Sequence, residues 1–213
     1  MLHAFIRLHY AHWPTICKQY MVNTLFPLDT NYPEGFTYTD NFITTDEEAQ
    51  LIGNIKQLEL HKFNFHGYTA NRKVASFGYD YSFDNGQLTK GADIPSTFNF
   101  LLEKVSSQVD IPVSDFGELL VIEYPPGAVI NWHRDAPPFD IICGVSLTSD
   151  CSFRLRPQDK AKQTRSSIIS IPIQPRSLYV MKGASRSEWQ HSTAPVKQTR
   201  YSITLRTLRN GSR

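Results

Sequence analysis

The stretch Glu123-Tyr-Pro-Pro-Gly-Ala-Val-Ile-Asn-Trp-His-Arg-Asp135 contains a strong turn signal between two short segments rich in apolar residues. Pro125-Pro126-Gly127 favours a tight turn, because proline fixes φ and glycine tolerates positive φ. The flanking segments, 118–124 and 128–135, have the length and composition of β-strands. The turn therefore predicts that the second half of the chain is built from short strands.

Turn residues separate several more strand-like segments further along the chain. We expect strands at 141–147, 151–156, 167–173, 177–182 and 199–208. Many short strands with regular breaks are typical of a sandwich or a jelly roll. The sequence therefore predicts an α+β, mainly β, fold.

Two amphipathic helices are expected before these strands. Thr45 with Glu48 three residues later predicts a capping box, and apolar residues follow at helical spacing. Ser96 is expected to cap a second helix, which turns Leu101 and Val105 towards the core. We predict that both helices pack on one sheet.

His133 and Asp135 are candidate metal ligands. Residues two apart on a strand point the same way, so both side chains would project towards one cation. Imidazole with carboxylate suits Fe(II), Mn(II) or Zn(II), whereas a structural zinc site prefers thiolates. His191, after the predicted strand 177–182 and a loop, is the best-placed third ligand. A surface histidine beside a turn aspartate, and a partly buried His191 without metal, remain open alternatives.

The last predicted strand places polar residues at every second position. Arg200, Ser202, Thr204 and Arg206 share one face by this alternation. Two arginines on one face can bind a small dicarboxylate, because each guanidinium can donate two hydrogen bonds to a carboxylate. A solvent-facing arginine pair fits the same alternation.

Composition sets wide limits on function. The 213 residues fit one domain, and a net charge of +2 permits nucleic acid as a partner without arguing for it. Three scattered cysteines indicate a reducing compartment, cytoplasmic or nuclear. The sequence contains no run of about 18 apolar residues, so it predicts no membrane span. Residues 1–20 are expected to be a non-functional extension, with Met21 a plausible start.

With these residues assembled, the chain resembles the AlkB-like Fe(II)- and 2-oxoglutarate-dependent dioxygenases. The matching segments are 123–135, Val145-Ser-Leu147, Gly183-Ala-Ser-Arg186 leading to His191, and Arg200-Tyr-Ser-Ile-Thr-Leu-Arg206. The resemblance implies one such domain over residues 21–213. Its double-stranded β-helix core would span about 118–209, and a nucleotide-recognition lid about 61–90.

The resemblance also implies roles for individual residues. It implies that Fe(II) is bound by His133, Asp135 and His191, with no catalytic residue beyond these ligands. The residues it assigns to 2-oxoglutarate are Tyr124, Arg200, Ser202 and Arg206. Of these, Arg200 would pair with the distal carboxylate and Arg206 would lie near the metal-bound end. The residues it assigns to the substrate are Arg72, Tyr79, Trp132 and Arg186.

The activity implied is oxidative demethylation of alkylated bases, with DNA as the first candidate substrate and RNA as the second. The reaction would consume O2 and release formaldehyde, succinate and CO2, and we expect the protein to be a monomer. A stacked base cannot reach a buried metal, so the target must be unpaired or flipped out. Three positions differ from the best-known bacterial member. Ile122 replaces an asparagine near the co-substrate, Pro137 a base-reading aspartate, and Arg72 a base-stacking tryptophan.

Substrate choice therefore remains open. The spacing from Gly183 to His191, with Trp189 inside it, resembles relatives that act on transfer RNA. Modification of tRNA and hydroxylation of protein side chains are alternatives with the same chemistry. A non-catalytic jelly roll that binds nucleic acid is an alternative of a different class.

Overall fold

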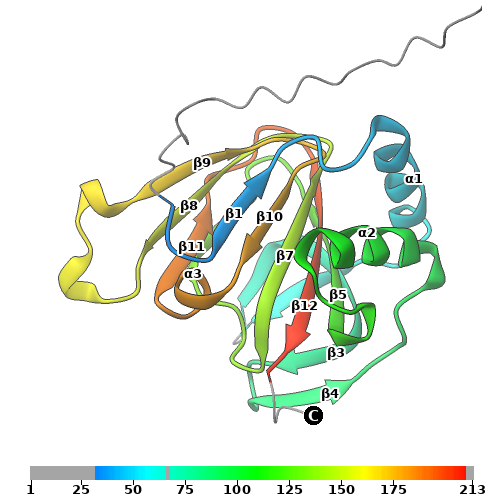
Figure 1. The fold of residues 1–213 in the computed structure, drawn as a ribbon, viewed down its shortest axis with the longest axis horizontal. Coiled ribbons are helices and arrows are strands. Elements are labelled where there is room, and N and C mark those ends of the chain that lie inside the picture. The colour runs from blue at the N-terminus through cyan, green and yellow to red at the C-terminus, as the bar shows by residue number, and fades with distance from the viewer. Residues whose placement is uncertain (1–31, 66–67, 210–213) are drawn as a thin grey trace, which may run out of the picture. The chain divides into compact units, whose positions relative to one another are not determined.

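Two antiparallel β-sheets form the core of the protein in a computed structural model that describes residues 32–65 and 68–209 (Figure 1). The larger sheet has the order β1-β10-β7-β12-β5-β3-β2, with β4 attached to β3, and the smaller sheet has the order β6-β11-β8-β9. The strands of the larger sheet are β1 (Phe36–Thr39), β2 (His61–Phe65), β3 (Tyr68–Ser82), β4 (Gln87–Lys90), β5 (Phe116–Tyr124), β7 (Phe139–Leu147), β10 (Leu178–Met181) and β12 (Arg200–Leu208). Those of the smaller sheet are β6 (Ile130–His133), β8 (Cys151–Pro157), β9 (Ile169–Ile173) and β11 (Trp189–Thr193). The predicted mainly β jelly roll is confirmed.

The described residues all belong to one unit, Asn31–Arg213. The expectation about residues 1–20 and Met21 falls outside the part of the chain that the structure describes. Short helical turns complete the fold at η1 (Ser96–Phe98), η2 (Val113–Asp115), η3 (Lys160–Lys162), η4 (Arg165–Ser167) and α3 (Gly183–Ser187).

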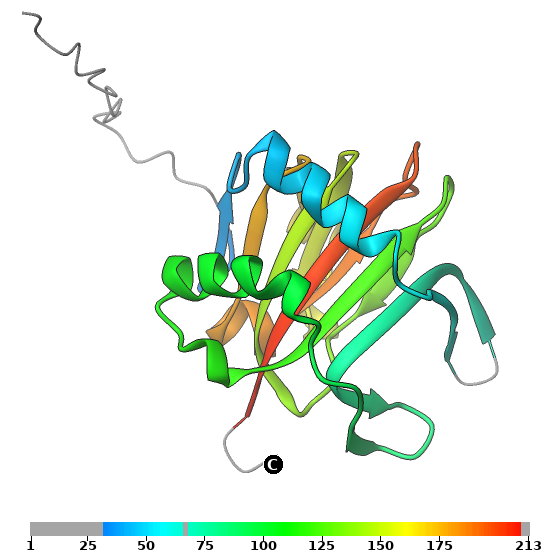
Figure 2. The same ribbon diagram turned by 90° about the vertical axis from the view of Figure 1, so that its right-hand side faces the viewer.

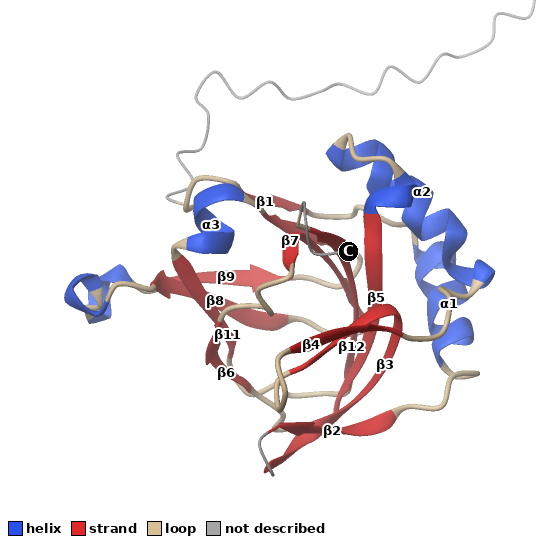
Figure 3. Cartoon of the chain, turned by 90° about the horizontal axis from the view of Figure 1, so that it is seen from below, coloured by secondary structure: helices blue, strands red, loops and turns tan. Residues whose placement is uncertain are grey.

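Helices α1 (Thr45–Ile55) and α2 (Asn99–Val109) cover one face of the larger sheet, and the smaller sheet lies against its other face (Figures 2 and 3). Leu51 and Ile55 of α1 are fully buried in one apolar cluster with residues of α2, β5, β7 and β12. This confirms the predicted helix layer.

Both helices start differently from the prediction. The capping box of α1 is formed by Thr44 and Glu47, one residue before the predicted pair, since the Thr44 side chain accepts from the Glu47 N–H and Glu47 accepts from the Thr44 N–H. Ser96 does not cap α2, because it begins the turn η1, and α2 follows at Asn99. For α1 the sequence allowed either capping pair, because Thr44 is followed by Thr45 and Glu47 by Glu48.

The predicted turn at Pro125-Pro126-Gly127 carries the chain from the larger sheet to the smaller one. Gly127 has a φ of +82°, which favours glycine, and the Ala128 N–H donates to the Pro125 carbonyl at 3.0 Å. Strand β6 is shorter than predicted and ends at His133, so Asp135 lies in the loop that follows. The two candidate ligands therefore converge through this loop as well as through strand alternation.

Strand β12 separates apolar from polar side chains as its alternation predicts. Ile203 and Leu205 are buried beneath the helices. Arg200, Ser202 and Thr204 turn to the other face, yet each is less than 5% exposed. The polar face of β12 thus lies inside the jelly roll, which excludes a solvent-facing arginine pair.

The segment expected to form a lid is continuous with the larger sheet. Strand β3 pairs with β5 from Lys73 to Gly78 and then with β4 from Tyr79 to Ser82. At Gly78 the φ is +85°, and a side-chain carbon there would lie 2.2 Å from the Gly117 carbonyl oxygen. Glycine is therefore required where β3 passes from the core to the β3–β4 hairpin.

Candidate active site

His133 and His191 lie opposite each other on neighbouring strands. They are register partners of β6 and β11, and their ring centroids are 4.2 Å apart. The sequence placed His191 after a loop and gave no bounds for a strand there. The structure shows β11, which pairs with β6 on one side and β8 on the other. This pairing brings the two histidines together from positions 58 residues apart.

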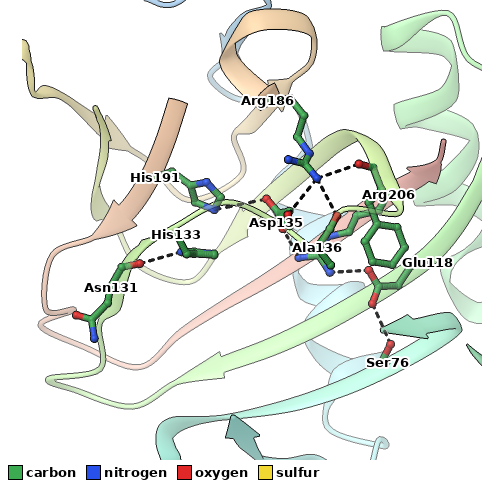
Figure 4. Close-up of polar contacts among 10 residues, drawn as sticks. Ser76, Glu118, Asn131, His133, Asp135, Ala136, Arg186, His191 and Arg206 are labelled. Carbon is green, nitrogen blue, oxygen red and sulfur yellow. Dashed lines mark hydrogen bonds and ion pairs between the residues drawn. The ribbon is translucent and has the colours of Figure 1, made fainter. Parts of the chain in front are cut away.

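Asp135 completes this group from the loop after β6 (Figure 4). Its Oδ2 lies 3.6 Å from His191 Nε2 and has no hydrogen-bond partner among the described residues, although the side chain is buried. A buried carboxylate oxygen without a partner is costly unless a cation or donor satisfies it. The unpaired oxygen beside two imidazoles is therefore suited to a metal cation.

Both histidines are held in the neutral form that binds metal. Burial, with His133 nearby, lowers the pKa of His191 to about 3. Burial also lowers the pKa of His133, despite the opposing effect of Asp135. His133 Nδ1 lies 2.8 Å from the Asn131 carbonyl, so it carries the proton and leaves Nε2 with a free lone pair.

Arg206 keeps Asp135 ionised. Burial alone would raise the pKa of this carboxyl group, but the guanidinium of Arg206, 2.6 Å from Oδ1, holds it well below its usual range. Chemically the donor set fits Fe(II), for which two histidines and one carboxylate form a known facial arrangement. Among the described residues, however, no three such side chains stand as a preformed metal site, so the ligand assignment stays a prediction.

Glu118 is a site residue that the sequence interpretation missed. It is only 2% exposed, accepts from Arg206 Nη1 at 2.5 Å, and is the register partner of Arg206 on β5. Ser76 of β3 also donates to it, at 3.1 Å. Burial raises the pKa of Glu118, and the charge of Arg206 opposes that shift. Glu118 and Tyr124 are an even number of residues apart on β5, so strand alternation places both side chains on the same face. This alternation was the sequence signal that could have identified Glu118.

Arg200 lies at the other end of the same strand face. It is 3% exposed, donates from Nε to Ser146 Oγ at 3.1 Å, and lies 5.1 Å from the centre of the Tyr124 ring. No carboxylate of the described residues forms an ion pair with it, although a buried guanidinium needs one. Ser202 shares this inner face between the two arginines. These positions agree with a carboxylate ligand beside Arg200.

The four expected substrate contacts are not gathered at one place. Trp132 precedes His133 on β6, so strand alternation places it on the opposite face of the sheet from the candidate ligands, and its expected substrate contact stays a prediction. Arg186 is buried, and its Nη2 donates to the carbonyls of Asp135, Ala136 and Phe139 (Figure 4). This placement favours a supporting role over a substrate contact.

The other two expected contacts lie on β3. The guanidinium of Arg72 stacks 4.2 Å from the centre of the Phe63 ring, and burial lowers its pKa. Tyr79 is half-buried in the β3–β4 hairpin, opposite Lys90. Phe77 packs against the apolar cluster beneath the helices, as a half-buried strand predicts.

A cavity of about 450 Å³ opens onto Asp135. Its lining residues are Phe83, Arg134, Asp135, Pro137, Gln158, Arg186, Gln190 and Arg209. The volume lies within the range of small-molecule sites. Pro137 is one of these lining residues, and it occupies the position at which the bacterial family member has a base-reading aspartate.

Comparison with known proteins agrees with this fold and site. A family model, the 2OG-Fe(II) oxygenase superfamily, matches residues 35–210. The chain therefore belongs to this superfamily, and its relatives place it among the AlkB-like members. This family consists of 2-oxoglutarate-dependent dioxygenases, which use Fe(II), 2-oxoglutarate and O2.

Two kinds of curated relative are similar in sequence. A tRNA (carboxymethyluridine(34)-5-O)-methyltransferase alkbh8 of Xenopus tropicalis is 25% identical over 178 residues, which cover 80% of this chain and 27% of that protein. An alpha-ketoglutarate-dependent dioxygenase alkB homolog 3 of Bos taurus is 28% identical over 90 residues, 37% of this chain and 32% of that protein. The chain thus spans about a quarter to a third of these two relatives.

A solved structure, described as that of OsALKBH1, superposes with a TM-score of 0.63 at 14% identity and covers 83% of this chain and 99% of that one. This similarity supports the fold.

No described helix of the chain is long and apolar enough to cross a membrane.

Proposed function

We propose that the protein oxidatively demethylates alkylated bases in single-stranded or locally opened nucleic acid, with DNA as the first candidate. The observation that carries this proposal is the Asp135 Oδ2 that no hydrogen bond of the described residues satisfies, beside two neutral histidines, in a residue that also lines a cavity of about 450 Å³. His133, Asp135 and His191 would hold Fe(II). The protein would act as a monomer in the cytoplasm or the nucleus.

The bound metal, with O2 and 2-oxoglutarate, supplies the oxidation of a C–H bond on the alkyl group. The protein's own side chains bind and orient. Arg200 is buried and has no counter-ion within residues 32–65 and 68–209. It would pair with the distal carboxylate of 2-oxoglutarate, and Tyr124 and Ser202 would line the same slot. Arg206 holds Asp135 ionised, with one oxygen free.

The cavity supplies the substrate side. Its volume suffices for a nucleobase, and an extruded base is the form in which such enzymes meet their target. Phe83 of the β3–β4 connection offers an apolar surface on one side, while Gln158 and Gln190 offer hydrogen bonds on the other. These groups would discriminate among bases, because Pro137 stands where the bacterial family member has a base-reading aspartate.

The test is a side-by-side assay. Purified protein with Fe(II), ascorbate and 2-oxoglutarate is incubated with N-methylated single-stranded DNA, methylated RNA and etheno-adducted DNA, and formaldehyde and succinate are measured. We expect formaldehyde from at least one methylated strand and none with His133→Ala. Silence on every strand, in a preparation that still turns over 2-oxoglutarate, rejects base demethylation.

Oxidation of a modified tRNA base is the second candidate. The similarity to the alkbh8 proteins extends over 80% of this chain, against 37% for the alkB homolog 3 proteins. Mass spectrometry of nucleosides from total tRNA, before and after incubation, distinguishes the two. New hydroxylated nucleosides without formaldehyde release would favour the tRNA candidate.

A further inference from the structure

Two arginines stack on one tryptophan on the outer face of the smaller sheet. Arg154 and Arg156 lie two residues apart on β8, and their guanidinium carbons are 5.2 and 4.5 Å from the centre of the Trp132 ring. Trp132 is next to His133 on β6, but the two side chains project from opposite faces of the sheet. The stack is thus separated from the candidate ligands by one layer of backbone.

Neutral groups hold both guanidinium groups in place. Arg154 donates from Nε to Ser192 Oγ at 3.1 Å and from Nη2 to the Thr193 carbonyl at 3.3 Å. Arg156 donates from Nε to Gln190 Oε1 at 2.7 Å. Within the described residues, no carboxylate forms an ion pair with either arginine. Two fixed like charges without a counter-ion favour an anionic ligand.

The charge continues into the loop between β8 and β9, which projects away from the sheet (Figure 1). Lys160, Lys162 and Arg165 are all exposed there, and none forms an ion pair within the described residues. The loop's single acidic residue, Asp159, instead accepts from the Ala161 N–H at 2.9 Å. We call Arg154, Arg156, Lys160, Lys162 and Arg165 the basic face.

Two lysines of the β3–β4 region are different, because acidic neighbours neutralise them. Lys73 lies 3.1 Å from Glu123, and Lys90 lies 3.3 Å from Asp93. The positive charge without an acidic partner therefore lies on the basic face of the smaller sheet. It does not lie on Lys73 and Lys90, which belong to the segment expected to form the lid.

The basic face adjoins the cavity at Asp135. Gln190, which accepts from Arg156, lines that cavity, and so does Gln158 at the start of the basic loop. A polynucleotide that places one base in the cavity would carry its neighbouring phosphates past these two glutamines. The negative charge of a phosphodiester backbone matches the positive charge of the basic face.

We propose that the basic face binds the phosphates of the single strand that flanks the target base, with the Trp132 ring holding the guanidinium groups of Arg154 and Arg156 in position. The nature of the target rests on the proposed function, but phosphate binding does not. Each arginine contributes one charge contact, so the effect on affinity is largely independent of sequence and falls with salt.

Binding of an unmodified 15-nucleotide single strand, as DNA and as RNA, tests this surface by fluorescence anisotropy at several salt concentrations. Arg156→Gln is expected to weaken binding roughly three- to tenfold and to reduce the slope of log affinity against log salt by about 0.7. The triple variant Lys160→Gln, Lys162→Gln, Arg165→Gln, which alters only exposed side chains, is expected to weaken binding at least as much.

Lys56→Gln is the matched control, because it removes one exposed charge at the end of α1, in the helix layer. It should bind like the wild type. Wild-type affinity and salt slope in both basic-face variants would overturn the proposal, as would a wild type that binds neither strand. Normal demethylation with unaltered binding rejects the basic face alone, whereas binding that depends on Arg156 without demethylation rejects the proposed function alone.

Discussion

Arg206 donates to Asp135 Oδ1 at 2.6 Å, while Oδ2 of the same carboxylate is left without a partner. One guanidinium thus fixes which oxygen remains available to a cation. The other Nη of Arg206 donates to Glu118, so its charge is shared between two buried carboxyl groups.

Glu118→Gln is predicted to weaken metal binding. Without the Glu118 charge, Arg206 loses its anchor and its full charge bears on Asp135, which reduces the attraction of that carboxylate for a cation. We expect roughly tenfold weaker Mn(II) binding, the size typical of residues that support metal ligands. Calorimetric titration of Mn(II) measures this directly. Glu103→Gln, on the exposed face of α2, is the control, and equal affinities in the two variants would contradict the role of Glu118.

Arg200→Ala is predicted to raise the requirement for 2-oxoglutarate. Removing a buried partner of a ligand carboxylate costs about 2–5 kcal/mol, which is roughly 30-fold or more in Kd. Titration of the Mn(II)-loaded protein with 2-oxoglutarate measures the change. Arg165→Gln, in the β8–β9 loop, should leave the Kd as in the wild type. Unchanged affinity in Arg200→Ala would assign the carboxylate to another residue.

Arg186→Gln is predicted to loosen the loop that carries Asp135. A glutamine cannot replace three hydrogen bonds to backbone carbonyls, and leaving buried carbonyls unsatisfied costs about 1–3 kcal/mol each. We expect a lower Tm and weaker Mn(II) binding, with unmodified oligonucleotides bound as by the wild type. Reduced oligonucleotide affinity at an unchanged Tm would instead restore the substrate contact expected from the sequence.

The metal-free protein is predicted to lose stability as the pH falls below about 6.5. The pKa of His191 is about 3 in the folded protein against an ordinary value of 6.5. Between these values the unfolded chain binds a proton that the folded chain excludes, so the free energy of unfolding falls by up to about 1.4 kcal/mol per pH unit. Urea titrations at pH 7.0 and 5.5 measure the slope. His191→Asn should flatten it, and an equal slope in that variant would show that another group is responsible.

Short-range patterns predicted much of this structure. Strand alternation correctly separated the two faces of β12, and Pro125-Pro126-Gly127 correctly placed a turn. Both signals depend on neighbouring residues alone. Strand β11 was not predicted, because it lacks an apolar alternation of its own and forms by pairing with β6 and β8.

The candidate site shows the same division. His133, Asp135, His191 and Arg200 were recognisable as residue types in a pattern, and the structure brings the first three together. Glu118 was missed because its partner, Arg206, lies 88 residues away, and only the register of β5 against β12 pairs them. The alternation of side chains along β6 separates Trp132 from its neighbour His133, so the two residues serve opposite faces of the smaller sheet.

Strand β3 is joined to β5 by backbone hydrogen bonds over six register pairs before it bends at Gly78. The β2–β3–β4 region therefore cannot swing open like a hinged flap without breaking that ladder. The β3–β4 hairpin lies beyond this ladder, and Phe83 at its turn lines the cavity at Asp135. We expect any widening of the cavity on this side to come from that hairpin, because the ladder fixes the part of β3 that precedes Gly78.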